Sequence, residues 1–421
     1  MSDSDFTAFK ASFFPRGVGR LRCPVQRYAW GHRATNSLVA RLAGLPPSTE
    51  PCAELWMGAH PSASSLLLAA SPDEPQTIPL NEAIARYPEA FLGGNVVQAW
   101  GPALPFLFKV LSVATPLSIQ AHPDADLARL LHARDPAHYP DASHKPEIGV
   151  ALGRVELLAG FRPSGELAAL CTAYPELESL LVPRGRIEGL TPEKVFRSLY
   201  DSSDAVFVAA MNSLARRLED RERSQRSVQE KYFLEALTEY GSADRGLGCF
   251  FILNFVTLDA GDAISIGPRY PHAYLSGDIV ECMANSDNVV RAGLTRKFQD
   301  RATLLDMLDY GATQPTILRA SDQCGEPNRL SYFPAEEFFI ERYTGEGAHF
   351  AHSAVRSAHI VACLEGGAAI ETAWGSETLS FGQVLLVPAF SGEWRLKIER
   401  GTCFVAGTPV DGEWSGHITD S

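Results

Sequence analysis

The sequence predicts a mainly β protein with a helical module inserted between its β segments. Three observations support this fold class. Short apolar runs broken by Pro and Gly fill the first 110 residues, apolar residues with helical spacing follow at about 160–245, and β-type segments run from about residue 330 onward. The chain has 421 residues, more than one ordinary hydrophobic core accommodates, so we expect two or three domains.

The first β region contains predicted strands at residues 55–57, 65–69 and 104–113. Further along, residues 116–123 read Pro-Leu-Ser-Ile-Gln-Ala-His-Pro. Because strand side chains alternate between faces, Ser118, Gln120 and His122 share one face of this segment. Pro123 lacks a backbone donor and ends the strand.

The helical module is predicted from its start signals and its apolar spacing. Ser164-Gly165-Glu166 opens an apolar run of helical spacing. Thr191-Pro192-Glu193 is a second start, with a capping residue, Pro at the first helical position and an acid in the first turn. Apolar residues at helix-compatible spacing follow it, namely Val195, Leu199, Val206, Ala210, Leu214 and Leu218.

Residues 249–256 return to the composition of a buried strand, and a linker with a short helix precedes the last β segments. A short internal echo links two of the β regions. Residues 261–268 and 382–388 both read as Gly, an alternating apolar strand and then Pro. His272 follows the first copy, whereas residues 390–394 after the second contain no His. The echo is what two β-barrels would show if only one kept a metal, but the match is short, so chance is a serious competing explanation.

Composition and charge exclude several classes of protein. The net charge of −13 argues against non-specific binding to nucleic acid or to an anionic membrane. Residues 1–22 lack the apolar core of a signal peptide, and no run approaches the roughly 18 apolar residues that span a bilayer. The eight cysteines form no CxxC pair, which favours free thiols. We therefore expect a cytoplasmic protein without nucleic-acid or membrane partners.

Three segments, at residues 118–124, 144–147 and 270–274, hold residue types that ligate metals. Their two imidazoles suit zinc and its neighbours, and a carboxylate adds a hard oxygen. A neutral Gln amide as a further ligand would leave a dication cationic and therefore electrophilic. The spacing alone leaves structural roles equally open, because hydrogen-bonded strand residues and turn histidines show the same residue types.

These segments lie within longer stretches that resemble one protein family. The stretches are Tyr28-Ala29-Trp30-Gly31, residues 53–62 (Ala-Glu-Leu-Trp-Met-Gly-Ala-His-Pro-Ser), 105–112 (Pro-Phe-Leu-Phe-Lys-Val-Leu-Ser), 117–124, 144–147 (His-Lys-Pro-Glu) and 271–295. They extend from residue 28 to about residue 310 on both sides of the helical module. In these stretches the chain is similar to the type I phosphomannose isomerases, also called mannose-6-phosphate isomerases, of the cupin superfamily.

The resemblance implies a fold and a metal centre. The fold is a cupin-type β-barrel (jelly-roll) catalytic domain at residues 1–160 and 246–320, an inserted α-helical domain at 161–245, and a second, metal-free cupin-like β domain at 321–421. The cofactor is one Zn²⁺ per chain, and its implied ligands are Gln120, His122, Glu147 and His272. Arg296 stands where the family commonly has Pro, which alters a loop or adds a charge but removes no ligand.

The resemblance also implies the interconversion of mannose 6-phosphate and fructose 6-phosphate through an enediol, a reaction that leads toward GDP-mannose. A base must move a proton between C2 and C1. Lys145 is the first candidate, because a metal beside Glu147 favours its neutral form; binding phosphate as a cation is an equal alternative. The further catalytic candidates are Asp287 for ring opening, Arg291 for the enediolate and Glu54, with ordinary charge pairing as the competing interpretation for each.

The substrate phosphate needs hydrogen-bond donors and cations to bind it. The same cations would form the local basic cluster that an anionic ligand requires in a chain with a net charge of −13. The candidates for substrate or phosphate binding are Ser118, Lys109, Lys145, Arg291, Arg296 and Lys297, with Tyr274 as a further substrate contact. We expect a monomer. Two other classes fit less well: an Fe(II) cupin oxygenase has a site richer in His, and a sugar-binding or storage cupin does not need so many ionisable groups around a metal.

Overall fold

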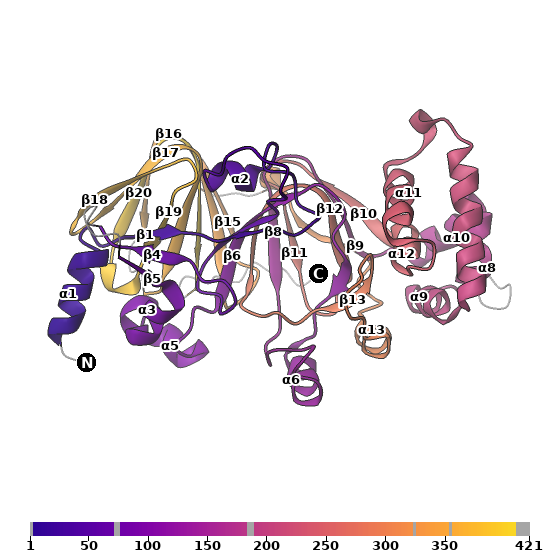
Figure 1. Cartoon of the computed structure of the whole chain (residues 1–421), viewed down its shortest axis with the longest axis horizontal. Coiled ribbons are helices and arrows are strands. Elements are labelled where there is room, and N and C mark those ends of the chain that lie inside the picture. Colours follow the sequence, from indigo (N-terminus) through magenta and orange to yellow (C-terminus); the bar gives the residue numbers. More distant parts are fainter. Residues whose placement is uncertain (1–2, 71–75, 183–188, 323–325, 353–355, 410–421) are drawn as a thin grey trace.

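The computed structural model describes residues 3–70, 76–182, 189–322, 326–352 and 356–409. In this part of the chain, a nine-stranded sheet, an eleven-stranded sheet and a group of helices follow one another along the long axis of the molecule (Figure 1). None of the described helices is both long enough and apolar enough to cross a membrane.

The eleven-stranded sheet contains the segments that carry the candidate ligands. Its strands are β2 (Val25–Gln26), β3 (Glu54–Met57), β6 (Phe106–Val113), β7 (Ile119–Ala121), β8 (Glu147–Ala151), β9 (Val155–Phe161), β10 (Leu253–Leu258), β11 (Ala263–Ile266), β12 (His272–Ala284), β13 (Val290–Gly293) and β14 (Thr316–Leu318). The main pairing path is β14-β11-β8-β12-β6-β3-β2, and β7, β9, β10 and β13 pair beside it. The predicted strands at residues 55–57 and 104–113 are confirmed as β3 and β6.

Strand β12 changes partners along its length and so serves two parts of this sheet. Its C-terminal half pairs with β6 and β8, whereas its first residues pair with β7 and β9. The change falls at Gly277, which has a φ of 113° and where a Cβ atom would lie 2.7 Å from the Arg154 carbonyl oxygen. Glycine alone adopts this conformation readily. One strand therefore places His272 opposite Gln120 and Glu281 opposite Lys109.

The nine-stranded sheet combines the C-terminal strands with three strands from the first 80 residues. Its members are β1 (Gly19–Arg22), β4 (Leu66–Leu68), β5 (Thr77–Pro79), β15 (Arg329–Tyr332), β16 (Phe339–His352), β17 (His359–Thr372), β18 (Gly375–Ser380), β19 (Val384–Val387) and β20 (Trp394–Gly407). The order is β15-β16-β20-β17-β19-β1-β4-β5, with β18 paired to β17. Residues 1–160, expected to form part of a single catalytic domain, thus contribute strands to both sheets.

The two sheets repeat one topology. Strands β6, β8, β11 and β12 are adjacent in the order β11-β8-β12-β6, and β16, β17, β19 and β20 are adjacent in the corresponding order β19-β17-β20-β16. The echoed sequences at 261–268 and 382–388 contain β11 and β19, which hold equivalent places in these two sets. The internal echo in the sequence therefore marks a structural repeat.

The expected closed barrels are absent from the described pairing. The main path of one sheet ends at β14 and β2, and that of the other ends at β15 and β5. These terminal strands are only two to four residues long, so they offer few backbone groups with which to close a ring of hydrogen bonds. One continuous apolar cluster instead joins the two open sheets, with Phe106 and Val280 from one and Ile360 and Leu386 from the other.

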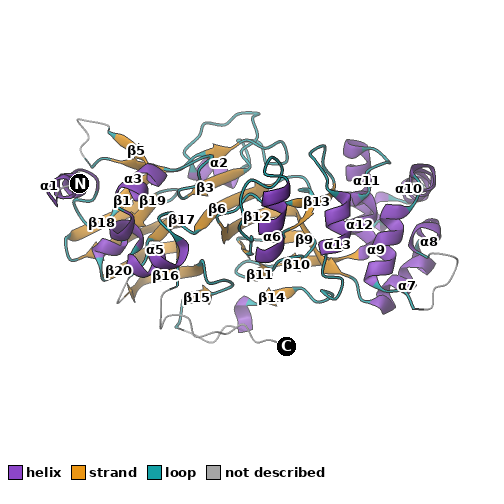
Figure 2. Cartoon of the chain, turned by 90° about the horizontal axis from the view of Figure 1, so that it is seen from below, coloured by secondary structure: helices purple, strands orange, loops and turns teal. Residues whose placement is uncertain are grey.

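The helical unit lies beyond β9, β10 and β13 at one end of the molecule (Figure 2). It contains α7 (Ser164–Ala173), α8 (Pro175–Leu181), α9 (Pro192–Asp201), α10 (Asp204–Glu219), η2 (Arg223–Gln225), α11 (Val228–Tyr240) and α12 (Gly246–Ile252). The predicted start at Thr191 is confirmed, because its side chain accepts the Lys194 N–H at 3.3 Å. The remaining helices are α1 (Asp3–Phe13), α2 (Leu38–Leu42), α3 (Leu80–Arg86), α4 (Pro88–Leu92), α5 (Gly94–Trp100), α6 (Ala125–Arg134), α13 (Arg301–Met307), η3 (Ala320–Asp322) and η4 (Ala389–Ser391).

The predicted strand at 249–256 is wrong over its first half. Residues up to Ile252 form α12, and β10 begins only at Leu253. All residues of α12 are buried, so the segment is apolar all round and its pattern does not distinguish a buried helix from a buried strand. Gly248 allows the close approach of α9, since a Cβ there would lie 2.6 Å from a Leu199 methyl group.

Candidate metal centre and active site

Three side chains from separate strands converge at the place where β7, β8 and β12 meet. His122 follows β7, Glu147 begins β8 and His272 begins β12. Each offers one ligand atom, and these atoms all lie within 4.8 Å of one another. The three side chains are almost fully buried, with exposures of 0%, 2% and 2%. In the described part of the chain this is the one such group of His, Cys, Asp or Glu residues.

Backbone carbonyls orient both imidazoles of this group. His122 Nδ1 lies 2.9 Å from the Asn288 carbonyl oxygen, and His272 Nδ1 lies 2.9 Å from that of Tyr270. Each Nδ1–H donates to its carbonyl, so each Nε2 carries a lone pair directed to the centre. The Nε2 atoms lie 3.3 Å from the two oxygens of Glu147, and that of His122 is buried without a hydrogen-bond partner in the part of the chain that the structure describes. Orphaned lone pairs around a carboxylate fit a divalent cation such as zinc.

Gln120 lies beside this group. It is the central residue of β7 and is directly opposite His272 in the strand register. Its side-chain amide approaches His272 Nε2, with 3.4 Å between the nitrogens, and oxygen and nitrogen of an amide exchange places by a simple flip. The amide oxygen is therefore available to the same cation as the two histidines. Gln120 also pairs with Arg291 of β13 on its other side.

The electrostatics of the centre favour the protonation states that metal ligands need. Burial lowers the pKa of His122 to about 4, against the attraction of Glu147. Burial alone would raise the pKa of Glu147, but Lys145 and His122 outweigh it and hold that pKa well below its ordinary value. The centre therefore presents a neutral imidazole beside an ionised carboxylate, as cation binding requires.

Lys145 lies directly beside the metal group. Its Nζ atom is 3.0 Å from Glu147 Oε1, and its side chain is buried. The sequence expectations for Lys145, as a base or as a cation for substrate oxygens, both need a position next to the metal. The contact with Glu147 also satisfies the competing structural interpretation, an ion pair.

A second buried cluster joins Lys109, Glu54 and Glu281. Lys109 pairs closely with Glu281, and its Nζ atom lies 3.9 Å from Glu54 Oε2. Burial opposes the charge on Lys109, yet Glu281 and Glu54 raise its pKa above the ordinary value. Trp56 Nε1 donates a hydrogen bond to the Glu54 carboxylate and holds it in position. Lys109 and Glu54 are thus already paired with protein groups.

The sequence reasoning missed Glu281 as a member of this cluster. The available signal was a charged residue within the apolar run at residues 279–283 of β12, since buried charges are normally paired. The sequence did not indicate the partner of Glu281, because Lys109 lies far from it in the chain. Lys109 belongs to β6 and faces Glu281 only when β6 and β12 pair.

Asp287 and Arg291 follow β12 and reach the site from a neighbouring segment. The Asp287 side chain is half exposed and lies 3.5 Å from Nε2 of the buried His60, a residue that no sequence argument selected. Arg291 is partly buried, and burial lowers the pKa of its guanidinium. Among the described residues Arg291 has no carboxylate within ion-pair distance, so this cation beside Gln120 is free for an anionic ligand.

The four remaining substrate candidates lie in four different environments. Ser118 is partly exposed just before β7. Lys297 is exposed, with its Nζ atom 5.7 Å from the centre of the Tyr28 ring. Arg296 turns toward the helical unit, where it lies 3.7 Å from Glu239 of α11. Tyr274 is 3% exposed and packs in the core, which leaves its hydroxyl no access to a phosphate.

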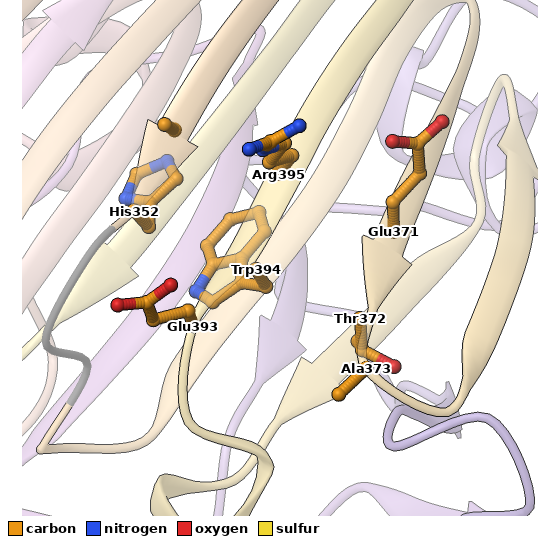
Figure 3. Close-up of a pocket in the computed structure, with 8 residues that line it drawn as sticks. His352, Glu371, Thr372, Ala373, Glu393, Trp394 and Arg395 are labelled. Carbon is orange, nitrogen blue, oxygen red and sulfur yellow. The ribbon is translucent and has the colours of Figure 1, made fainter.

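The nine-stranded sheet offers no comparable group of ligands among its described residues. An open cavity of about 420 Å³ lies at one end of this sheet and is lined by Ala351, His352, Glu371, Thr372, Ala373, Glu393, Trp394 and Arg395 (Figure 3). Its two carboxylates, Glu371 and Glu393, stand on opposite sides of the cavity and do not converge (Figure 3). The repeat of topology therefore does not extend to a second convergent ligand set.

Comparisons with known proteins agree with these findings. The family model described as "Phosphomannose isomerase type I, catalytic domain" matches residues 18–164. Mannose-6-phosphate isomerase 1 of Arabidopsis thaliana is 38% identical over 395 residues, which cover 89% of this chain and 90% of the relative. Mannose-6-phosphate isomerase of Homo sapiens is 40% identical over 310 residues, covering 69% and 72% of the two chains.

Solved structures give the same result over nearly the whole chain. The mannose 6-phosphate isomerase of Salmonella typhimurium, crystallised with substrate (F6P) and zinc, has a TM-score of 0.80 at 29% identity, covering 94% of this chain and all of that one. A zinc-bound holo structure of mannose 6-phosphate isomerase has a TM-score of 0.78 at 29% identity, with the same coverage. On its sequence, its fold and its buried His-Glu-His group, this chain belongs to the type I phosphomannose isomerase family.

Proposed function

We propose that this chain is a zinc-dependent aldose–ketose isomerase that interconverts mannose 6-phosphate and fructose 6-phosphate. The observation that carries the proposal is the buried group of His122, Glu147 and His272. Their ligand atoms converge, and Nε2 of His122 has no hydrogen-bond partner among the described residues. Family membership supplies the substrate, because the relatives are mannose-6-phosphate isomerases and one was crystallised with F6P.

One zinc ion per chain would be held by Gln120, His122, Glu147 and His272. Three of these ligands are neutral, so one carboxylate leaves the dication with a net positive charge. When bound, the ion supplies Lewis acidity, which polarises a substrate oxygen and favours the charge of an enediolate. The buried position excludes bulk water and strengthens this effect.

Lys145 is proposed as the base that moves the proton. It removes the proton from C2 of the open-chain aldose and returns it to C1, while a proton passes from the C2 hydroxyl to the C1 oxygen. Its buried amine, 3.0 Å from the proposed ligand Glu147, supports this role, because a substrate oxygen held by the metal would bring the neighbouring carbons toward it. Arg291, a cation without a carboxylate partner among the described residues, would stabilise the enediolate.

Asp287 is proposed to act in ring opening, since its carboxylate is half exposed at the edge of the site. Glu54 and Lys109 would act indirectly, as a buried ion pair that shapes the floor of the active site. We assign the phosphate to Lys297 and Ser118. Arg296 is left out because it contacts α11, and Tyr274 because it is buried.

We further propose two cupin-like β units that share the first 100 residues, and a monomeric, cytoplasmic enzyme. The repeated strand order supports the two units. The free state of the seven described cysteines, six of them buried, supports a reducing compartment.

A coupled isomerase assay with mannose 6-phosphate tests the proposal directly. Activity should fall to the background after chelation and return with zinc, in proportion to the zinc measured in the same sample. Absence of turnover in the zinc-restored protein would overturn the proposed function.

The role of Lys145 needs its own variant. Lys145→Met should lower kcat by about 10²–10⁴-fold, the range of general base catalysis, while zinc stays bound. Lys194→Met, an exposed lysine in α9, serves as the control and should retain wild-type turnover. Near-normal turnover of Lys145→Met with full zinc would remove Lys145 as the base.

A further inference from the structure

His60 lies in a contact that the proposed reaction has not yet used. It follows β3 and is 4% exposed, whereas Asp287 lies in the segment between β12 and β13. His60 Nε2 and Asp287 Oδ1 are 3.5 Å apart. This separation is long for a hydrogen bond, but active-site contacts commonly tighten only when the substrate is bound.

Ser62 determines which nitrogen of His60 carries the proton. Its backbone N–H donates to His60 Nδ1 at 3.3 Å, and its hydroxyl oxygen lies 2.7 Å from the same nitrogen. A backbone N–H has no acceptor capacity, so Nδ1 must present its lone pair. The proton of the neutral ring therefore lies on Nε2, the nitrogen that faces Asp287.

The ring of His60 is also fixed from the side. Its edge packs against Trp56, with 4.9 Å between the ring centres and 72° between the planes. Trp56 donates in turn to Glu54, which belongs to the buried cluster with Lys109. His60 is thus held by packing and by hydrogen bonds, whereas Asp287 itself is half exposed and has more freedom.

The other charged groups around Asp287 leave His60 as its main partner. Its backbone N–H donates to Asp141 at 2.9 Å, which anchors the main chain but not the carboxylate. The hydrogen-bonding influence of His60 is the largest effect on the pKa of Asp287 and lowers it, with smaller contributions in the same direction from Lys145 and Lys109. The hydroxyl of Tyr28 is near enough to be affected by Asp287 as well.

We propose that His60 is the positioning residue of Asp287: its Nε2–H holds one carboxylate oxygen and leaves the other free for the sugar. The inference rests on the proposed function. In ring opening Asp287 accepts the proton of the anomeric hydroxyl, the C1–O5 bond breaks as the C1 carbonyl forms, and O5 takes a proton from a solvent water molecule, which regains a proton from Asp287. A carboxylate that rotates freely would perform this transfer less often, because misplacement by about 1 Å can reduce a rate 10²-fold.

The test compares kcat and KM of the zinc-loaded wild type with those of His60→Ala, His60→Gln, Asp287→Asn and the double variant His60→Ala/Asp287→Asn. His60→Ala should lower kcat by about 10- to 100-fold with full zinc content and a KM within about 3-fold. His60→Gln should recover most of kcat, because its amide N–H reaches the place of Nε2–H. His349→Ala, an exposed histidine of β16, is the matched control and should behave as the wild type.

The double variant separates positioning from a merely structural role. If His60 acts through Asp287, the double variant should be no slower than Asp287→Asn alone. Multiplied losses in the double variant, or a His60→Gln variant as slow as His60→Ala, would overturn the inference.

A spectroscopic measurement makes the inference independent of the isomerase assay. In ¹⁵N NMR of the wild type without substrate, His60 should appear as the Nε2–H tautomer, and its Nε2 signal should shift in Asp287→Asn. An Nδ1–H tautomer, or an Nε2 signal that Asp287→Asn leaves unchanged, would reject the pairing. An inactive wild type would instead contradict the proposed function, and the NMR result would still decide the role of His60.

Discussion

Trp394 begins β20 as His272 begins β12, and the two strands hold equivalent places in the two sheets. His272 points into the metal group, whereas Trp394 is 1% exposed and stacks on His352 with 4.0 Å between ring centres. An aromatic ring thus takes the place in the nine-stranded, C-terminal sheet that a proposed zinc ligand has in the eleven-stranded sheet. Packing stabilises the C-terminal sheet at this place, whereas the eleven-stranded sheet presents the proposed ligands of an ion.

This relationship predicts that Trp394→Ala destabilises the protein without reducing its metal content. Removing a buried Trp typically costs about 3–5 kcal/mol of unfolding free energy. Denaturant unfolding with zinc analysis of the folded protein measures both quantities. Trp374→Ala, which removes a tryptophan that is 45% exposed, is the control and should change stability far less. Loss of zinc from folded Trp394→Ala would contradict the separation of the two sheets.

Gln120→Ala should weaken zinc binding, because it removes a neutral oxygen donor next to His272. We expect a loss of affinity of about 10- to 100-fold, comparable to the loss of a partner group around a metal site. Competition with a chromophoric chelator measures the zinc affinity. The control is Gln299→Ala, an exposed glutamine outside the site. A variant with full affinity and full activity would refute the ligand role of Gln120.

How much of this centre was readable from the sequence depends on the kind of residue. Thr191 caps its helix through a local hydrogen bond, and β6 is apolar apart from Lys109 and Ser112, so both were predicted correctly. Gln120 and His122 share one short segment, but their convergence with Glu147 and His272 followed only from the family resemblance. Spacing along a chain does not report which strands become neighbours.

The residues that were missed depend on contacts between distant segments. His60 meets Asp287, and Glu281 meets Lys109, only after β3, β6 and β12 have paired. The same reason explains why β1 and β4 were not expected in the C-terminal sheet. The closed barrel was expected from the resemblance to the cupin superfamily. Closure depends on the length of the edge strands, and the apolar pattern of the sequence does not show that these strands are short.

Acid should destabilise the C-terminal sheet through His359. Burial lowers the pKa of this histidine from 6.5 to about 3, and neither of its ring nitrogens has a hydrogen-bond partner among the described residues. Between these two pH values the unfolded chain binds the proton and the folded one does not, so stability falls as the pH drops from about 6.5 to about 3. At about 1.4 kcal/mol per pH unit, the loss approaches roughly 5 kcal/mol at the lower end of this range.

His359→Phe should remove part of this acid sensitivity, because Phe fills a similar volume and takes up no proton. Unfolding free energies measured in denaturant at several pH values between 7 and 4 give the slope for each variant. His349→Ala, at an exposed position of β16, should keep the wild-type slope. An unchanged slope in His359→Phe would show that other groups bind the protons.

The buried pair of Lys109 and Glu281 should separate stability from catalysis. Glu281→Gln leaves Lys109 with less counter-charge in a buried place, and breaking a buried pair typically costs about 3–5 kcal/mol. The remaining attraction of Glu54 toward Lys109 places the expected loss at the lower end of that range. The double variant Lys109→Met/Glu281→Leu should regain most of the stability, since apolar replacement of a whole buried pair is often neutral.

Among these Lys109 and Glu281 variants, kcat should not rise and fall with the free energy of unfolding. If the cluster shapes the floor of the site through its charges, the double variant should fold with full zinc and remain slow. The measurements are the unfolding free energy, the zinc content and kcat of each variant. Wild-type kcat in the stable double variant would show that Lys109 and Glu281 serve the fold alone, and it would restrict the catalytic charges to Lys145, Asp287 and Arg291.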